Sequence, residues 1–283
     1  MQAMAHSEGS YRYNRFQNRS EELDRLKMQA RIALSIEQEI WRQAGLRVGM
    51  TVLDLACGPG ATSCELAKRV TPGGKVIGVD INPGLIEVAE QIRLTDPLEN
   101  VSFRVGNAYA LDLPPATFDF VYARFLFQHL ENPRDALRTV HRVLKPGGIL
   151  CVLDIDDAWT SFSPASAAFR TFIRKSGAGQ KRRGGNREIG SRLYGLLHDA
   201  GFQKVATRIY PVTTADIGVR NFLGLAVLFR LELLGRFRKL LLLRQLKKIK
   251  AASGHEAAWG ALGIFVATGA VPCPRNSDRY DDS

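Results

Sequence analysis

The chain has 283 residues, 45% of them hydrophobic, and a formal net charge of +11 at pH 7. This length and hydrophobic content predict one large globular domain with insertions, or one domain and a small cap. We expect neither a membrane span nor a secretory leader, because the chain has no apolar run of ~18 residues and does not open with a basic region followed by an apolar one.

The first 45 residues form an N-terminal helical segment ahead of the first predicted strand. Leu23, Leu26 and Ala30 recur at helical spacing, and Ser20 stands where a helix N-cap is favoured. We expect two helices over residues 20–45, closing one edge of a ligand site. Residues 11–16 mix aromatic side chains with cations, a composition that by itself also fits a frayed tail.

Residues 52–63 predict a buried strand, a glycine turn and the start of a helix. Gly58 and Gly60 take backbone angles that a Cβ forbids and leave room for a ligand against the main chain. The helix beginning near Ala61 points its free N–H groups at that ligand. An ordinary tight turn is the alternative. Ser63 stands where a dinucleotide fold has its third glycine, and no Walker lysine follows, which argues against a dinucleotide and a triphosphate.

A second predicted strand, residues 75–80, ends in an acid. Asp80 lies 26 residues beyond Asp54, and an acid at this strand end binds ribose hydroxyls in doubly wound sheets. The alternative is a capping aspartate for the helix that starts near Pro83. Asp80 therefore favours a nucleoside ligand.

From Thr51 onward, strand and helix patterns alternate, which predicts the doubly wound α/β class, a mostly parallel sheet with helices on both faces. The expected strands are residues 51–56, 75–80, 101–105, 118–124, 147–155, 203–211 and 262–268. The expected helices between them are residues 60–70, 83–95, 133–144 and 189–200. The domain is expected to span residues 46–270, with a disordered tail over 271–283.

With these elements the chain resembles the class I S-adenosylmethionine-dependent methyltransferases, whose first motif is an acid followed by Gly-x-Gly. The resemblance continues through Gly106-Asn107-Ala108, the strand 118–124 and the Leu-Lys-Pro-Gly-Gly sequence that ends at Gly148. It implies a Rossmann-like seven-stranded sheet in the order 3-2-1-4-5-7-6, with strand 7 antiparallel. The stretch 126–130, Leu-Phe-Gln-His-Leu, resembles the branches that methylate small molecules and quinones.

The resemblance also implies a cofactor site. The glycine turn would contact the methionine part of S-adenosylmethionine, Asp80 the ribose, and Arg124 and Phe125 the floor between donor and acceptor. Asn107 stands where the family more often has aspartate, and its amide oxygen can still accept a hydrogen bond from adenine. The predicted cofactor residues are Asp54, Ala56, Cys57, Gly58, Gly60, Asp80, Ile81, Asn107, Ala108, Arg124 and Phe125.

Methyl transfer from an already activated sulfonium asks the protein mainly for position and a dry site. A hydroxyl acceptor also requires a base, and His129 is the candidate because neutral imidazole accepts a proton near pH 7. A structural histidine is the alternative, and Asp154 and Asp156 compete for the role. The predicted catalytic residues are His129 and Arg124. The predicted substrate or lid residues are Tyr11, Tyr13, Phe127, His129 and Asp154, since N-terminal segments of the family often fold over the ligands.

Two cap insertions interrupt the alternating pattern, at residues 157–188 and 213–258. The tip of the first, residues 177–187, is basic and glycine-rich, which predicts either a surface loop or a lid carrying Lys181 to Arg187 toward an acidic group. The sequence of the second insertion predicts a helix over residues 221–250, with leucines beside a basic stretch at 230–250. It fits an ordinary cap, a cover over a lipophilic substrate, or a peripheral membrane contact.

We therefore expect a methyltransferase acting on a small, lipophilic or aromatic metabolite, with O- or C-methylation favoured over N. No nucleic-acid partner is expected, because no stacking module accompanies the basic charge. The alternatives are a non-catalytic binding or membrane-surface scaffold protein of the same fold, and an RNA methyltransferase. The spacing of Cys57, Cys64, Cys151 and Cys273 fits no metal site, so we expect a reduced, cytoplasmic protein without metal.

Overall fold

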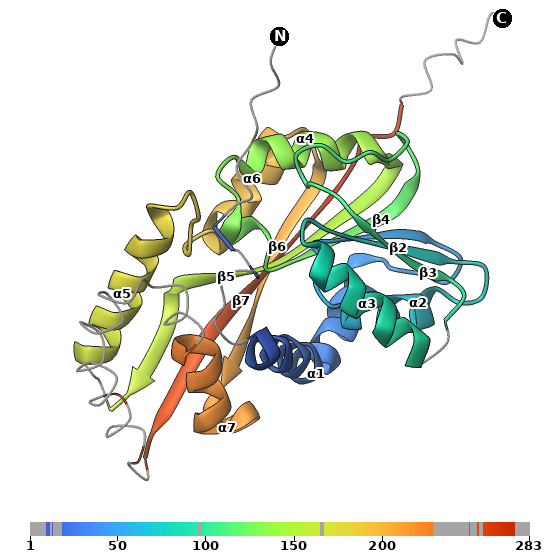
Figure 1. Cartoon of the computed structure of the whole chain (residues 1–283). Coiled ribbons are helices and arrows are strands. Elements are labelled where there is room, and N and C mark those ends of the chain that lie inside the picture. Colours follow the sequence, from blue (N-terminus) through green and yellow to red (C-terminus); the bar gives the residue numbers. More distant parts are fainter. Residues whose placement is uncertain are drawn as a thin grey trace, which may run out of the picture.

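The computed structural model describes residues 10, 11, 13, 19–95, 98–164, 167–228, 249, 254 and 257–274. A seven-stranded sheet in the order β3-β2-β1-β4-β5-β7-β6 crosses the molecule (Figure 1). Strands β1 to β5 pair in parallel, whereas β7 is antiparallel to β5 and β6. The predicted class and strand order are confirmed. The strands are β1 Thr51–Leu55, β2 Lys75–Asp80, β3 Val101–Val105, β4 Phe118–Arg124, β5 Leu144–Ser163, β6 Gln203–Thr213 and β7 Trp259–Ala270.

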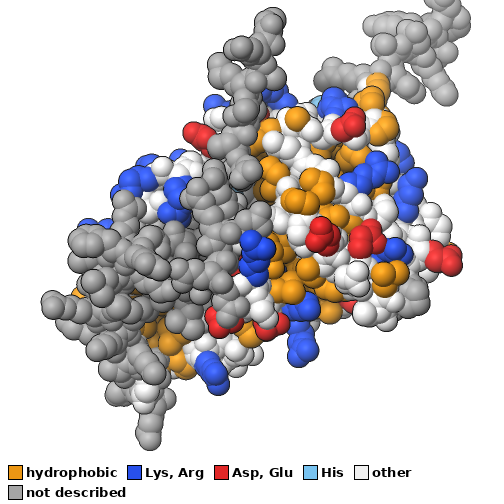
Figure 2. Space-filling model, viewed as in Figure 1, with side chains coloured by type: hydrophobic (Ala, Val, Ile, Leu, Met, Phe, Trp, Pro, Cys, Tyr) orange, Lys and Arg blue, Asp and Glu red, His pale blue; other side chains and the backbone are white. Residues whose placement is uncertain are grey.

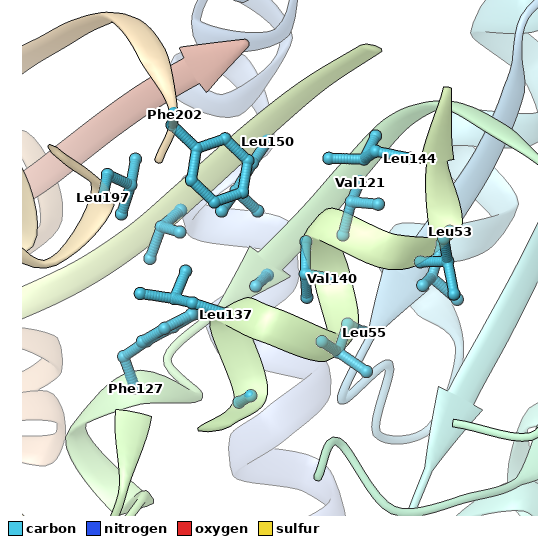
Figure 3. Close-up of a cluster of buried hydrophobic side chains, with 14 of the residues drawn as sticks. Leu53, Leu55, Val121, Phe127, Leu137, Val140, Leu144, Leu150, Leu197 and Phe202 are labelled. Atoms are coloured by element: carbon cyan, nitrogen blue, oxygen red, sulfur yellow. The ribbon is translucent and has the colours of Figure 1, made fainter. Parts of the chain in front are cut away.

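Helices cover both faces of the sheet. On one face, α1 Arg19–Ala44, α2 Ala61–Val70 and α3 Pro83–Thr95 contribute to a core that contains Trp41, Leu66 and Ala89. On the other, α4 Pro133–Val143 and α6 Leu193–Asp199 pack on alternate side chains of β1, β4 and β5. Figure 3 shows this second core, in which Leu137 and Val140 of α4 lie beside strand residues. The short 3-10 helices are η2 Phe127–His129 and η3 Gly190–Arg192.

The N-terminal helical segment is simpler than predicted. One helix, α1, runs for 26 residues where we expected two over residues 20–45. Ile40 and Trp41 near its carboxyl end are almost fully buried against the sheet. Tertiary packing of this end, together with an unbroken run of helix-forming residues, explains the continuous helix.

The first insertion is ordered differently from the prediction. Strand β5 continues to Ser163, and α5 Ala167–Lys181 follows it, so residues 177–181 of the predicted glycine-rich tip are helical. Pairing with β7 carries the strand onward, because Ser161–Ser163 align with residues 259–261 after a register shift. Phe162, Phe169 and Phe172 then form a third core with Phe222. The small polar residues around position 163 hide this extension from a hydrophobic pattern.

The second insertion begins with α7 Thr214–Leu223. Thr213 and Asp216 form a capping box at the amino end of this helix. It continues as a π-helical turn, Gly224–Leu228. The basic stretch 230–250 lies outside the described residues apart from Ile249, so its predicted membrane contact stays a prediction. Within the described parts of the chain, no helix combines the length and apolarity that a bilayer crossing demands. The predicted disordered tail is described only to position 274.

The described surface carries both signs of charge. On the face shown in Figure 2, Lys and Arg side chains alternate with Asp and Glu and with hydrophobic groups.

Candidate functional site

A cavity of about 500 Å³ lies at the carboxyl ends of β1, β2 and β4. This is the edge where the strand order reverses around β1, the usual ligand position in doubly wound sheets. Helix α1 contributes one wall, and the α7 region with β6 and β7 contributes another. The predicted cofactor residues line it except Gly60: Asp54, Ala56, Cys57, Gly58, Asp80, Ile81, Asn107, Ala108, Arg124 and Phe125.

The glycine turn after β1 is built from left-handed backbone. Ala56, Gly58 and Gly60 all have positive φ, at 64°, 55° and 79°. The N–H groups of Ala56 and Cys57 both donate to the carbonyl of Val79, at 2.7 and 3.1 Å, and fix the turn to β2. A non-glycine residue such as Ala56 tolerates this conformation only where its surroundings impose it. The turn is therefore a preformed feature of the cavity rim.

The two glycines of this turn, Gly58 and Gly60, differ in what surrounds them. A Cβ on Gly58 would meet nothing within 4 Å, because this residue faces the open cavity. A Cβ on Gly60 would lie 2.6 Å from the Phe103 ring and 2.8 Å from Ala89 Cβ. Gly60 thus allows α2 to pack on β3 and α3. Gly60 does not line the cavity, and its predicted contact with the cofactor stays a prediction.

Asp54 is almost fully buried at the end of β1. Its Oδ2 accepts a hydrogen bond from Ser63 Oγ at 2.5 Å. Burial raises the pKa of Asp54 to about 7, although the Ser63 hydrogen bond opposes that rise. Ser63, which stands where dinucleotide folds have glycine, therefore positions the acid that borders the cavity. No local sequence pattern indicates this role of Ser63.

Asp80 joins the glycine turn to the start of α3. Its Oδ2 accepts from the Gly58 N–H and its Oδ1 from the Asn82 N–H, both at 2.9 Å. Burial raises the pKa of Asp80 despite these hydrogen bonds. The side chain that caps α3 is Asn82, whose Oδ1 accepts from the Leu85 N–H at 3.2 Å. The capping alternative for Asp80 is thus unnecessary, and its carboxylate borders the cavity.

The loop after β3 also lines the end of the cavity that Asp54 and Asp80 border. The Oδ1 of Asn107 accepts from the Tyr109 N–H at 2.9 Å, which closes a local turn. One acceptor position of the Asn107 oxygen is therefore already used. Its amide N–H groups are the donors that this side chain offers to a nucleoside base. Ile81 is 40% exposed, as expected for an apolar side chain that flanks a ligand.

Arg124 ties the floor of the cavity to α1. Its Nε lies 2.5 Å from Glu37 Oε1, and its Nη2 donates to the carbonyl of Gln29 at 3.1 Å. Its guanidinium also lies 4.8 Å from the centre of the Phe125 ring. Phe125 has φ of 52°, so strained backbone recurs at the end of β4. Arg124 lines the cavity as predicted, but these contacts hold α1 in position, and none of them marks it as a catalytic group.

The far end of the cavity brings together distant polar residues. His129 Nδ1 lies 2.9 Å from Ser10 Oγ and 3.2 Å from Gln180 Nε2. Beneath it, Arg187 pairs with Asp157 at 3.1 Å and donates to Gln128 Oε1 at 2.5 Å. Arg187 is 6% exposed and already paired with Asp157, so it is not part of a solvated loop tip; the lid alternative for Lys181 to Arg183 stays a prediction.

The N-terminal aromatic residues divide between cavity and core. The Tyr11 hydroxyl donates to Glu22 Oε1 at 2.6 Å, and its ring centre lies 5.4 Å from that of His129. Glu22 also pairs with Arg25, which lines the cavity as Tyr11 does. Tyr13 is buried and donates to the carbonyl of Arg19 at 3.3 Å. Tyr11 therefore matches its predicted position, whereas Tyr13 does not line the cavity.

Two further predicted substrate residues lie below the cavity. Phe127 is fully buried among the α4 side chains, beside Leu137 in Figure 3. Asp154 is also fully buried, and it accepts from the N–H groups of Gln128 and Ile155 at 3.0 and 2.9 Å. Burial raises its pKa to about 7. Both predictions are corrected: Phe127 fills the core, and Asp154 holds the start of η2 in place.

Apolar side chains line the remaining wall. Leu26, Ala30 and Ala33 come from α1, and Ile217, Leu225, Ala226, Leu262 and Ile264 come from the α7 region and β7. Among the described residues, no group of three or more His, Cys, Asp or Glu is arranged to hold a metal. The cavity thus has a polar end near β1 and β2 and an apolar side between α1 and α7.

A family model described as "Methyltransferase domain" matches residues 46–200. The ubiquinone/menaquinone biosynthesis C-methyltransferase UbiE of Hydrogenovibrio crunogenus is 42% identical over 113 residues, which are 39% of this chain and 44% of that protein. The demethylmenaquinone methyltransferase of Lactococcus lactis is 33% identical over 132 residues, 44% of this chain and 52% of that protein. The chain thus matches only about half the length of these curated relatives.

Among solved structures, the YcgJ protein of Bacillus subtilis is similar with a TM-score of 0.57 and 19% identity. The similarity covers 85% of this chain and 99% of that one, and it concerns the fold alone. Together these matches confirm the resemblance inferred from the acid, the glycine turn and the later motifs.

Proposed function

Because this chain belongs to the methyltransferase domain family, we propose that it transfers the methyl group of S-adenosylmethionine to a small, largely apolar acceptor. The observation that carries the proposal is the two-part cavity. Its polar end offers two buried carboxylates and an open glycine turn, and its other side is apolar. Such a division suits a nucleoside cofactor next to an apolar co-substrate.

At the polar end, Asp80 would bind the ribose hydroxyls, and Asp54 with the turn at Gly58 would bind the methionine part. Asp80 supports this assignment because its two oxygens are already oriented by backbone N–H groups and each retains acceptor capacity. Ile81, Asn107 and Ala108 would surround the base. The bound cofactor supplies an electrophilic methyl group, and the chain supplies its position and the exclusion of water.

For the acceptor we propose a hydroxylated aromatic ring of the quinol type, methylated on carbon or oxygen. Two relatives carry names of quinone methyltransferases, and the apolar wall between α1 and α7 would hold the ring and any apolar substituent. Holding the acceptor against the donor accounts for much of the rate of such a reaction. The membrane contact of residues 230–250 stays a separate prediction.

The first test is calorimetric titration with S-adenosylhomocysteine, followed by incubation of the protein with S-adenosylmethionine and reduced naphthoquinones with and without an isoprenoid chain. We expect binding, and a methylated quinol detected by mass spectrometry. Absence of S-adenosylhomocysteine binding would contradict the donor assignment. Binding without methylation of any quinol would favour the non-catalytic alternative or another acceptor.

The ribose assignment predicts the effect of Asp80→Ala. Hydrogen bonds to a charged acceptor contribute about 1.5–3 kcal/mol each, so losing two should weaken S-adenosylhomocysteine binding by about 100-fold or more. Asp112→Ala, at an exposed position, is the matched control and should leave the affinity unchanged. Melting temperatures of both variants show whether they remain folded. Unchanged affinity in folded Asp80→Ala would refute the assignment.

A further inference from the structure

The imidazole of His129 is held through one nitrogen. Its Nδ1 faces Ser10 Oγ at 2.9 Å and Gln180 Nε2 at 3.2 Å. The backbone holds the same assembly together, since the Ser10 N–H donates to the His129 carbonyl at 2.9 Å. Among the described residues, the Nε2 of His129 has no hydrogen-bond partner, and the side chain lines the cavity.

The amide of Gln180 decides which nitrogen of His129 carries the proton. Its Nε2 also donates to the backbone carbonyl of Gln128 at 3.0 Å, and a carbonyl can only accept. The amide group facing His129 is therefore the NH2 group, a donor. Nδ1 must accept from it, because two N–H groups would repel each other. A neutral ring that accepts at Nδ1 carries its proton on Nε2.

The surroundings keep this ring neutral. Burial lowers the pKa of His129 to about 3, and the nearby positive charges of Arg187, Arg25 and Arg183 act in the same direction. Arg187 is held by Asp157 and Gln128, and Arg25 by Glu22, so these charges are fixed around the ring. A weakly basic, neutral imidazole is poorly suited to remove a proton near pH 7.

We infer that His129 presents a fixed Nε2–H to the cavity and donates a hydrogen bond to a carbonyl, hydroxyl or phenolate oxygen of the acceptor, instead of acting as its base. This rests on the proposed methyl transfer. A donor at this position restricts the acceptor to molecules with an oxygen lone pair next to the methylated atom. It also favours an acceptor whose own hydroxyl is acidic enough to lose its proton without a base from His129. An amine without such an oxygen would leave the donor unsatisfied.

The tautomer is tested on the intact protein labelled with ¹⁵N-histidine, without any substrate. A multiple-bond ¹H–¹⁵N correlation spectrum at pH 7 distinguishes protonated from unprotonated ring nitrogens, and the spectrum of His129→Gln assigns the His129 signals. The exposed His198 serves as an internal reference. We expect an unprotonated Nδ1 and a protonated Nε2. The opposite tautomer, or a doubly protonated ring, would overturn the inference.

The role toward the acceptor is tested with two substitutions. Glutamine places an N–H donor near the position of Nε2 but is no base, whereas phenylalanine fills the space without a donor. We expect His129→Gln to keep kcat/KM for the quinol within about tenfold and His129→Phe to lose about ten- to hundredfold. Equal loss in both variants would indicate a base. Failure of the proposed function would instead appear as absent S-adenosylhomocysteine binding in the unaltered protein.

Discussion

The two ends of the cavity are built in opposite ways. The end proposed for the donor comes from two short stretches, residues 54–60 and 79–82. The N–H groups of Ala56 and Cys57 donate to the Val79 carbonyl, and the Gly58 N–H donates to the Asp80 carboxylate. The acceptor end depends on side chains of Ser10, Gln128, His129, Gln180 and Arg187, which are far apart in the sequence. A local motif thus forms the surface proposed for the cofactor, whereas the surface proposed for the acceptor forms only when remote elements assemble.

The largest effect that separates the two ends is expected from Arg187→Met. The substitution removes the Arg187 cation that pairs with the buried Asp157, and breaking a buried pair typically costs about 3–5 kcal/mol. We expect urea denaturation to show a loss of this size, while S-adenosylhomocysteine affinity in the folded variant stays within about twofold.

The double variant Arg187→Met with Asp157→Leu is the control for this prediction, since removing both charges of a buried pair is often close to neutral. We expect it to recover most of the lost stability. A loss of S-adenosylhomocysteine affinity in either folded variant would show that the two ends of the cavity are coupled and not built independently.

The next effect divides the glycine turn itself. Gly60→Ala brings a Cβ into Phe103 and Ala89 at a positive φ, so we expect a stability loss of about 3 kcal/mol. Gly58→Ala shares the backbone strain but meets open space, so we expect a loss of only about 1 kcal/mol together with weaker S-adenosylhomocysteine binding. Denaturation and calorimetry on both variants measure this. Equal stability losses would refute the division into a packing glycine and a ligand-facing one.

The smallest effect concerns the proton on Asp54. Its pKa of about 7 means that the carboxyl is largely protonated at pH 5 to 6, whereas a cationic amino group of the ligand favours the carboxylate. Affinity for S-adenosylhomocysteine should therefore rise between pH 5 and 7, by at most about tenfold per unit. Asp54→Asn should flatten the rise, with the raised pKa of Asp80 leaving a smaller slope of the same sign. An unchanged slope in Asp54→Asn would separate Asp54 from the ligand amino group.

Much of the fold was predictable because its elements have strong local signals. The strands ending at Asp54 and Asp80 are apolar runs closed by an acid, and the glycine turn requires backbone angles that few other residues adopt. The resemblance added the strand order, which periodicity alone does not supply. The α1 segment and the extension of β5 to Ser163 were mispredicted, since pairing with β7 and packing on the sheet decide their lengths.

Part of the site was predictable for the same reason, and the rest was not. Asp54, Gly58 and Asp80 border the cavity as expected, because their positions follow from the ends of adjacent parallel strands. Phe127 and Asp154 lie one or two residues from cavity residues, yet their side chains point into the core. A sequence gives the position of such residues but not the direction of the Phe127 side chain in the 3-10 turn η2 or of the Asp154 side chain in β5.

The amino-acid pattern alone predicts the doubly wound sheet and the glycine-turn rim proposed for the donor, and the resemblance carried by its motifs indicates the methyltransferase family. Those features depend on neighbouring residues and on the alternation of strands and helices. Only the tertiary structure decided that Arg187 is buried, that Arg124 binds α1 and that His129 faces Gln180 through Nδ1. Contacts between residues 10, 129 and 180 leave no periodic trace in the chain, because they arise when separate loops and helices close around one cavity.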